Sequence, residues 1–205
     1  MTARSPLIGV LCLQGSFAEH ISSLERLGAR TAQVRLPSQL RDVDALVIPG
    51  GESTTFLKLM DAFSLREPLR EAISGGLPVL ATCAGVVVLA NEIVSHKMAP
   101  LGMLNVQIAR NAFGRQVESF EEDLVLEGIS GVPFRGVFIR APIIQDCGPS
   151  VNVMARLQNG TIVACRQGRI LATSFHPEFV PDLRVHEYFL NMVNEALNGP
   201  VTKTK

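Results

Sequence analysis

Cys83 is the residue whose sequence setting most clearly favours chemical reactivity. An apolar run, 79–81, precedes it, the small residues Ala84 and Gly85 follow, and a second apolar run continues over 86–90. This pattern predicts a strand, a tight turn and a buried helix, and it nearly matches the nucleophile turn G-x-S-x-G with sulfur in place of oxygen. The helix dipole favours a thiolate at such a turn, and free backbone N–H groups can hold an oxyanion. The competing interpretation is a small, inert core cysteine.

A histidine and a glutamate two residues apart provide the second signal, in Ser174-Phe-His-Pro-Glu178. The motif follows an expected strand, and residues i and i+2 of an extended chain project to the same side. Pro177 restricts the intervening φ, so we expect His176 and Glu178 to be neighbours. The carboxylate would orient the imidazole and stabilise its charged form, as covalent catalysis by a thiol requires. For this motif alone, the alternative is a strand-ending turn with a surface ion pair.

A glycine pair provides the third signal, in Pro49-Gly-Gly-Glu-Ser-Thr-Thr55, which lies between a buried strand and a helix. Two glycines allow the backbone to approach a ligand closely. A phosphate-binding loop is a competing function, but the Gly-Lys-Ser/Thr ending is missing. A helix cap at Ser53 is the structural alternative. An oxyanion-holding turn explains the double glycine better.

Alternating strands and helices would bring these signals together. The expected strands of the first half are 7–13, 31–36, 45–48 and 79–81, within the order β-α-β-β-α-β-α. This alternation predicts an α/β fold with a mostly parallel central sheet between helical layers. Ligands bind such sheets beyond the carboxyl ends of the strands. That edge would carry Gln14, the Gly50-Gly51 turn and Cys83.

The second half changes to short strands separated by turn signals. The expected strands are 105–109, 124–126, 137–140, 151–157, 161–166 and 170–174. No linker rich in Pro, Gly or Ser separates the halves, so we expect an antiparallel extension of one flavodoxin-like domain over 1–198. A helix at about 181–197 and a flexible tail at 199–205 would end the chain.

Composition restricts the classes of protein that fit. The 205 residues carry a formal net charge of +0, which argues against a nucleic-acid-binding protein. No apolar run approaches the roughly 20 residues of a membrane helix, and the N-terminus does not resemble a signal peptide. The four cysteines, Cys12, Cys83, Cys147 and Cys165, include no C-x-x-C pair, which argues against a zinc site or a disulfide framework. These features predict a cytoplasmic protein.

The motifs together resemble a known family. The order Cys…His-x-Glu, with P-G-G-E-S-T and T-C-A-G, is similar to the triad glutaminases of class I amidotransferases. Further segments look like the glutaminase subunits of pyridoxal 5′-phosphate synthase: Gly9-Val-Leu-Cys-Leu-Gln-Gly15, Arg110-Asn-Ala-Phe-Gly-Arg-Gln116 and Phe138-Ile-Arg-Ala-Pro142. The motifs span residues 9 to 178 in the expected order. One departure is Ala81, where relatives often have glycine.

The resemblance implies a role for each matching position. Cys83 would attack the side-chain carboxamide of L-glutamine, His176 would pass a proton to the departing ammonia, and Glu178 would orient His176. A γ-glutamyl thioester would form on the thiol and then be hydrolysed. The other implied positions are oxyanion N–H groups at Gly51 and Ala84 and glutamine-binding residues at Gly51, Glu52, Ser53, Arg110, Ile139 and Arg140. An arginine suits the substrate α-carboxylate, and either arginine remains a candidate beside the alternative of a surface salt bridge.

The reaction also implies a partner. Free ammonia is protonated at neutral pH and lost to solvent, and this chain leaves no room for a second catalytic domain. The resemblance names the partner as the synthase subunit that builds pyridoxal phosphate, in a large hetero-oligomer. Gln14 and the Gly15-Ser16 turn are candidates for the activating contact. The resemblance implies that this chain itself binds no metal and no cofactor.

Two alternatives stay open. One is a glutaminase for another acceptor, such as a histidine- or folate-pathway synthase, against which P-G-G-E-S-T and R-N-A-F-G-R-Q argue. The other is a non-catalytic module in which Cys83 senses redox state or the chain acts as a regulator. The accompanying histidine and glutamate disfavour this second alternative, because a binding module needs no orienting carboxylate. The remaining histidines, His20, His96 and His186, are expected to be solvated or structural.

Overall fold

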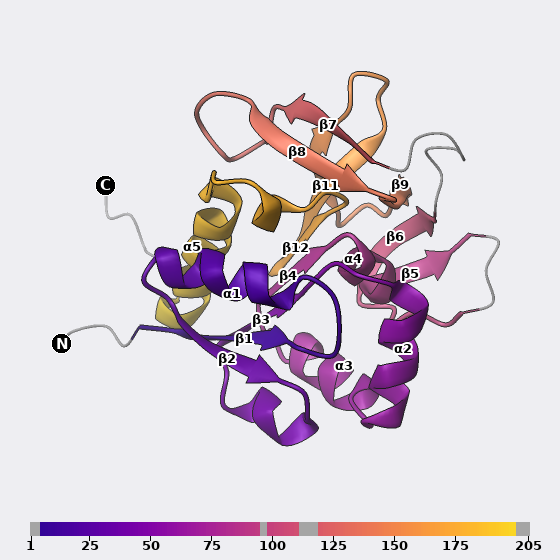
Figure 1. The fold of residues 1–205 in the computed structure, drawn as a ribbon. Helices are drawn as coiled ribbons and strands as arrows, with labels where there is room; N and C mark the ends of the chain where they lie inside the picture. The colour runs from indigo at the N-terminus through magenta and orange to yellow at the C-terminus, as the bar shows by residue number, and fades with distance from the viewer. Residues whose placement is uncertain (1–4, 95–97, 111–118, 200–205) are drawn as a thin grey trace.

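The fold is a large, curled sheet with helices on both faces (Figure 1). The computed structural model describes residues 5–94, 98–110 and 119–199. His96, most of the 110–116 motif and residues 200–205 lie outside the described residues. No helix in the described ranges is long and apolar enough to cross a bilayer.

Parallel strands form the half of the sheet that carries Cys83. The strands are β1 (Leu7–Leu11), β2 (Arg30–Val34), β3 (Ala45–Ile48), β4 (Val79–Thr82) and β12 (Ile170–Thr173). β12 comes late in the chain but pairs in parallel with β4, with Ala172 opposite Ala81. The order β2-β1-β3-β4-β12 therefore brings the carboxyl ends of β4 and β12 side by side.

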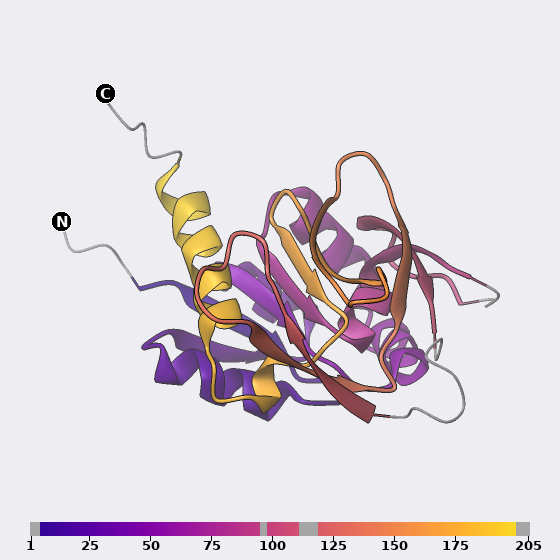
Figure 2. The same cartoon turned by 90° about the horizontal axis from the view of Figure 1, so that it is seen from above.

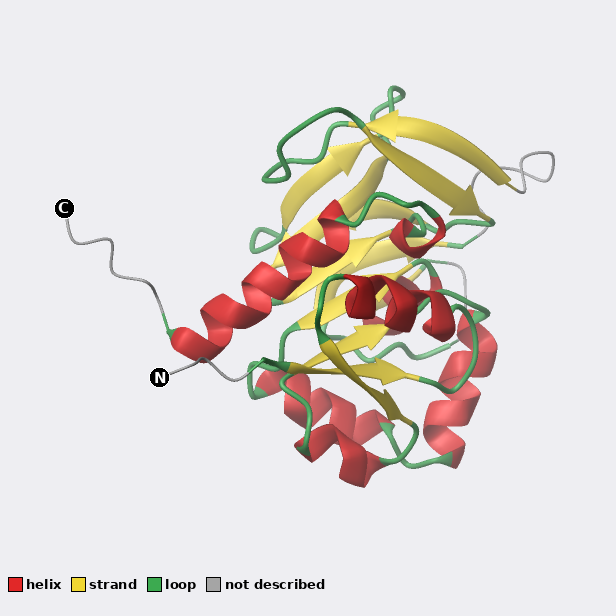
Figure 3. Cartoon of the chain, turned by 60° about the vertical axis from the view of Figure 1, so that its left-hand side comes forward, coloured by secondary structure: helices red, strands yellow, loops and turns green. Residues whose placement is uncertain are grey.

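Helices cover both faces of this half, as the continuous apolar strands require. The helices are α1 (Phe17–Arg26), α2 (Ser53–Ala62), α3 (Arg66–Ser74), α4 (Ala84–Leu89) and α5 (Arg184–Asn198), with 3-10 turns η1 (Pro37–Arg41) and η2 (Pro177–Phe179). α1 and α5 pack on one face, where Leu24 and Phe189 share a core with Val47 (Figure 3). α2 and α3 pack on the other, where Phe56 and Ile73 belong to a second core.

Mostly antiparallel strands extend the sheet. They are β5 (Ala90–Ile93), β6 (Leu104–Ala109), β9 (Ile143–Cys147), β10 (Asn152–Arg156) and β11 (Ile162–Gln167). β7 (Ser119–Leu124) and β8 (Phe134–Ile139) form a separate antiparallel pair that crosses above the main sheet (Figures 1 and 2). The backbone N–H of His176 donates to the Val137 carbonyl at 2.8 Å, which fastens the turn after β12 to β8.

The α/β fold with a mostly parallel central sheet is confirmed, but some element predictions were wrong. The apolar run 86–90 is not all helix, because α4 ends at Leu89 and Ala90 begins β5. β5 and β9 were missed, since each contains exposed polar residues typical of loops and is ordered by pairing with β6. The strand expected at 124–126 is instead β7, which ends at Leu124.

Candidate active site

Cys83 occupies the tight turn that the sequence predicts. It lies between β4 and α4 with φ 47° and ψ −106°, a conformation that costs a side-chain-bearing residue about 1–3 kcal/mol. The Cys83 backbone N–H donates to the Thr173 carbonyl of β12 at 2.8 Å. At Gly85, an added Cβ would collide with the Ile48 carbonyl, so glycine allows α4 to start close against β3. The turn presents the thiol at the carboxyl edge of the sheet.

His176 and Glu178 are direct partners. His176 Nδ1 lies 2.7 Å from Glu178 Oε1, and the two side chains are 6% and 0% exposed. The expectation that an extended chain places them together was wrong, because Pro177–Phe179 form the 3-10 turn η2. The turn brings Glu178 back beneath the imidazole, and the pairing itself was correctly anticipated.

The electrostatics of this pair favour an imidazolium. Burial disfavours the charged ring of His176, but a hydrogen bond with Cys83 and interactions with Glu178 outweigh it and raise its pKa to about 10. Burial likewise favours the neutral acid at Glu178, but His20 and His176 hold its pKa well below the ordinary value. The buried carboxylate and the imidazolium therefore stabilise each other's charged forms.

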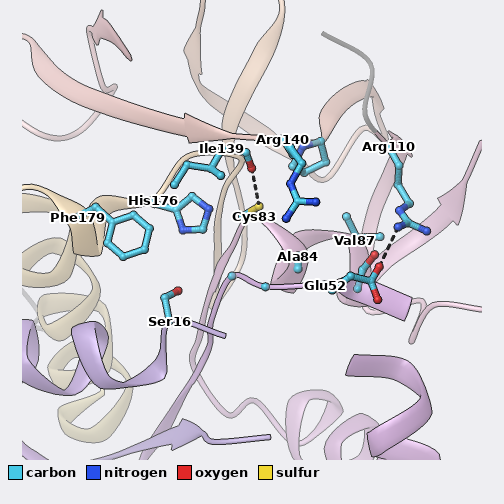
Figure 4. A pocket seen from close by; sticks show the side chains of 14 residues that line it. Ser16, Glu52, Cys83, Ala84, Val87, Arg110, Ile139, Arg140, His176 and Phe179 are labelled. Atoms are coloured by element: carbon cyan, nitrogen blue, oxygen red, sulfur yellow. Dashed lines mark hydrogen bonds and ion pairs between the residues drawn. The ribbon is translucent and has the colours of Figure 1, made fainter. Parts of the chain in front are cut away.

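A pocket of about 300 Å³ opens in front of the thiol (Figure 4). Its lining includes Ser16, Gly50, Gly51, Glu52, Ser53, Cys83, Ala84, Val87, Arg110, Ile139, Arg140, Pro142, His176 and Phe179. Gly50 lies so close to the reactive groups that an added Cβ would collide with Cε1 of His176 and approach Cβ of Cys83 to 3.3 Å. The predicted glycine turn, thiol and histidine thus line one cavity.

Glu52, rather than Ser53, caps the helix after the glycine turn. Its carboxylate accepts from the backbone N–H groups of Thr54 at 3.1 Å and Thr55 at 2.7 Å. Burial raises the pKa of Glu52, but these N–H groups outweigh it and lower the pKa to about 2. Ser53 instead begins α2 and is buried on the pocket wall.

Gln14 fastens the same turn from β1's carboxyl side. Its Nε2 donates to the Glu52 carbonyl at 3.3 Å, and its Oε1 accepts from the Glu52 N–H at 3.2 Å. Gly51 has φ 152°, and a Cβ there would approach the Gln14 amide to 2.5 Å. Any movement of Gln14 would therefore displace the Gly51-Glu52 segment.

The two arginines lie differently in the pocket. The Arg110 guanidinium pairs with Glu52 at 3.0 Å and donates to Thr54 Oγ1 at 3.3 Å. Arg140 follows β8 with φ 43°, and Figure 4 shows its guanidinium extending into the pocket rather than toward Glu52. At the neighbouring Ile139, the carbonyl lies 3.9 Å from the Cys83 sulfur.

Sequence reasoning missed several contacts at this site, including that of Ser16, which was expected only in the candidate activating turn. Ser16 donates its hydroxyl to Glu178 Oε1 at 2.6 Å, and Phe179 stacks on His176 with ring centroids 4.9 Å apart. His20 and His186 are fully buried, so of the two roles expected for them, solvated or structural, burial excludes the solvated one. His20 even approaches Glu178, at 3.3 Å. Phe179 could be suspected beside the His-Pro-Glu motif, but nothing local in the sequence marks the others.

Solved structures define the class of protein. One described as a glutamine amidotransferase has a TM-score of 0.86 and 48% sequence identity, covering 91% of this chain and 98% of its own. A putative GMP synthase subunit from Thermoplasma acidophilum has a TM-score of 0.70 and covers 95% of this chain and 97% of its own. At 16% identity, this second structure supports the fold alone. The fold is that of the glutamine amidotransferases.

The chain can also be assigned to one family within this class. The model of the SNO glutamine amidotransferase family matches residues 10–195, and the chain belongs to that family. Pyridoxal 5′-phosphate synthase subunit PdxT of Kineococcus radiotolerans is 52% identical over 207 residues, covering 97% of this chain and 100% of the relative. The subunit PdxT of Pelotomaculum thermopropionicum is 55% identical over 183 residues, covering 89% and 93%. The family resemblance read from the motifs is confirmed.

Proposed function

We propose that this chain hydrolyses L-glutamine to L-glutamate and ammonia, and that it supplies the ammonia to a partner subunit of pyridoxal 5′-phosphate synthase. The observation that carries the proposal is the Cys83 thiol facing the His176–Glu178 pair across the adjacent ends of β4 and β12. The names of relatives about half identical over most of the chain support the pathway.

In the proposed reaction, the Cys83 thiolate attacks the carboxamide carbon of glutamine. The raised pKa of His176 keeps a proton available on the imidazole at neutral pH, and that proton goes to the departing ammonia. The thiol is then esterified as a γ-glutamyl thioester. Water, deprotonated by the now neutral His176, cleaves the thioester, while Glu178 holds the ring in place throughout.

The tetrahedral intermediate needs donors for its oxyanion. We assign this role to the backbone N–H groups of Gly51 and Ala84, which line the pocket on either side of Cys83. Ala84 begins α4, where backbone N–H groups lack intrahelical acceptors. Fixed donors of this kind stabilise developing negative charge without reorganisation during the reaction.

The rest of the substrate would occupy the pocket between Glu52 and Arg140. We assign the α-carboxylate to Arg140, because its guanidinium extends into the pocket while that of Arg110 is engaged with Glu52. The Glu52 carboxylate, ionised at neutral pH, suits the α-ammonium group. Ser53 and Ile139 form the adjoining walls, and Arg110 orients Glu52.

Gln14 is proposed as the link between partner docking and activity. Its amide holds both the N–H and the carbonyl of Glu52, next to the assigned oxyanion donor at Gly51. A partner that displaces Gln14 would reset this segment. We further infer one glutaminase domain over 1–198 and a cytoplasmic location, where the four free cysteines would stay reduced.

The test is ammonia release from glutamine with and without an added pyridoxal 5′-phosphate synthase subunit, using Cys83→Ala as the blank. We expect release to rise strongly with the partner and to vanish in the variant. Ammonia release at the same rate with and without the partner would still support glutamine hydrolysis but would contradict the assigned pathway. If no ammonia is released in either case and a glutamine-analogue electrophile fails to label Cys83, the proposal that the chain is a glutaminase would be contradicted.

A further inference from the structure

His20 is a fully buried histidine that the proposed reaction does not use. It lies on α1, on the inner face of that helix, with no exposed surface. Buried imidazoles require partners for both ring nitrogens, because an unmade hydrogen bond in the interior costs free energy. The partners of His20 come from β4, η2 and α5, the elements that carry or surround the reactive groups.

The Nε2 atom of His20 faces two oxygens of the active-site framework. It lies 3.1 Å from Oγ1 of Thr82, the residue before Cys83, and 3.3 Å from Oε2 of Glu178. Among the described residues, Glu178 Oε2 has no hydrogen bond of good geometry, so this approach is its polar contact. The other oxygen, Oε1, is shared by His176 at 2.7 Å and Ser16 at 2.6 Å.

The proton on His20 can be placed from the chemistry of its neighbours. An ionised carboxylate only accepts hydrogen bonds, so Nε2 carries a hydrogen whether His20 is neutral or charged. Its Nδ1 lies 2.9 Å from Nε2 of His186. Burial and the neighbouring His20 lower the pKa of His186 to about 3, so His186 stays neutral at neutral pH. The Nε2–H group of His20 therefore hydrogen-bonds Thr82 and lies in ionic contact with the Glu178 carboxylate, while Nδ1 contacts His186.

We propose that His20 is a positioning residue for Glu178, holding Oε2 so that Oε1 remains on Nδ1 of His176. The same nitrogen contacts Thr82, so a single ring also ties the nucleophile strand to the turn that carries the base. This inference rests on the proposed function of Cys83, His176 and Glu178. It adds to that function a support on α1, one helical turn after Ser16.

Removal of the ring has a defined consequence. Without the imidazole, Oε2 of Glu178 loses its polar contact at 3.3 Å while remaining buried, so the group rotates away or takes up a proton. Both changes weaken its hold on the imidazolium of His176. The imidazolium in turn is hydrogen-bonded with Cys83, so the thiol becomes less reactive. A substitution on α1 thus changes the reactivity of the Cys83 sulfur through Glu178 and His176.

The decisive variants are His20→Leu and the pair His20→Gln and His20→Asn. Leucine removes both polar contacts, the glutamine amide nitrogen replaces Nε2 and faces Glu178, and the asparagine amide replaces Nδ1 and faces His186. Leu24→Ala is the matched control, since Leu24 is equally buried on the same helix but has no contact assigned to the reaction. All four are assayed in the complex with the synthase subunit and alone, with thermal unfolding measured in parallel.

In the complex, we expect His20→Leu to lower kcat about 30-fold with KM for glutamine within about twofold, whereas His20→Gln stays within about fivefold of wild type. His20→Asn should match leucine, and Leu24→Ala should stay within about threefold despite a lower unfolding temperature. In the free subunit, iodoacetamide should modify the Cys83 peptide about threefold more slowly in His20→Leu than in the wild type, as measured by mass spectrometry at about pH 7.

Several outcomes overturn the inference. They are equal loss of kcat in His20→Leu and Leu24→Ala, equal activity of the glutamine and asparagine variants, or an unchanged alkylation rate. If leucine prevents folding, the glutamine–asparagine comparison decides. Wild-type complex that releases no ammonia contradicts the proposed function instead, and the alkylation rates of the free subunit still support or overturn the role of His20.

Discussion

The two sides of the pocket are built in opposite ways. On the catalytic side, Cys83, His176 and Glu178 follow buried parallel strands, and their polar partners come from the protein itself. On the substrate side, Arg110 and Arg140 follow β6 and β8 of the antiparallel region and are only partly covered or exposed. The difference teaches that the groups proposed for the chemistry are preorganised, whereas the groups proposed for substrate binding would exchange water or a temporary ion pair for the substrate.

The largest effect should come from the catalytic side. His176→Asn removes the proton donor and base, so kcat for glutamine hydrolysis in the complex should fall about 10⁴-fold. Because the amide retains a polar contact with Glu178, the variant should still fold and bind the partner, which size-exclusion chromatography checks. Retention of more than about a hundredth of the wild-type rate would assign the base elsewhere.

A smaller but still large effect should come from Gly50→Ala. The added methyl group would collide with the His176 ring and should lower kcat about 100-fold by displacing the base. The matched control is Gly160→Ala, where no atom lies within 4 Å of the added Cβ but φ is 87°. This control should lose thermal stability and keep its activity. Equal activity of both variants would contradict the close approach of the glycine turn to the histidine.

The substrate side should respond in affinity. Arg140→Ala should raise KM for glutamine about 30-fold with kcat within about threefold, because the α-carboxylate loses a charged partner used throughout the reaction. Arg110→Ala, which acts by orienting Glu52, should raise KM less. Arg140→Lys keeps the charge without the bidentate geometry, so its KM for glutamine should lie between those of the wild type and Arg140→Ala. A larger KM effect at Arg110 would reverse the assignment of the two arginines.

The smallest effect concerns the stability of the catalytic side. His186 has a pKa of about 3 in the folded protein, mainly because it is buried, against 6.5 as the ordinary value. The unfolded chain therefore takes up a proton below pH 6.5 that the folded chain accepts only near pH 3. The contribution of neutral His186 to the free energy of unfolding is complete above pH 6.5 and is lost as the pH is lowered toward 3. Between about pH 7.5 and pH 5.5, this loss amounts to about 1 kcal/mol.

His186→Leu should remove that part of the pH dependence. Its free energy of unfolding, measured with urea, should therefore decline less than that of the wild type as pH is lowered. Arg140→Ala should follow the wild-type pH dependence, because the substrate side contains no comparable buried histidine among its pocket residues. Parallel curves for His186→Leu and the wild type would show that another group titrates.

The sequence predicted the catalytic side well because its signals are local. The Cys83 turn needs small residues immediately after the thiol, and the His-Pro-Glu motif places the histidine and its orienting carboxylate two residues apart. The parallel sheet rule then joined the two motifs, and β12 beside β4 agrees with it. Even there, the backbone of η2 was predicted incorrectly, because proline fits both an extended chain and a 3-10 turn.

Other parts of the site have no local signal. Ile139 and Arg140 were nominated only by family resemblance, since a strand-end arginine is usually a surface residue. The contacts of Ser16 and His20 with Glu178 arise where α1 packs beside η2, an element that is far from both residues in sequence. Similarly, β5 and β9 are strands because β6 is available to pair with them. Such features depend on the completed tertiary structure.

The late position of β12 in the chain also has a consequence during synthesis. Cys83 follows a strand made early, whereas the strand that leads to His176 emerges from the ribosome after most of the polypeptide. A nascent chain therefore carries the thiol for a long time without the histidine. By the proposed mechanism, glutamine is not consumed until β12 has inserted next to β4, and a product terminated before β12 would be inert rather than a source of wasted ammonia.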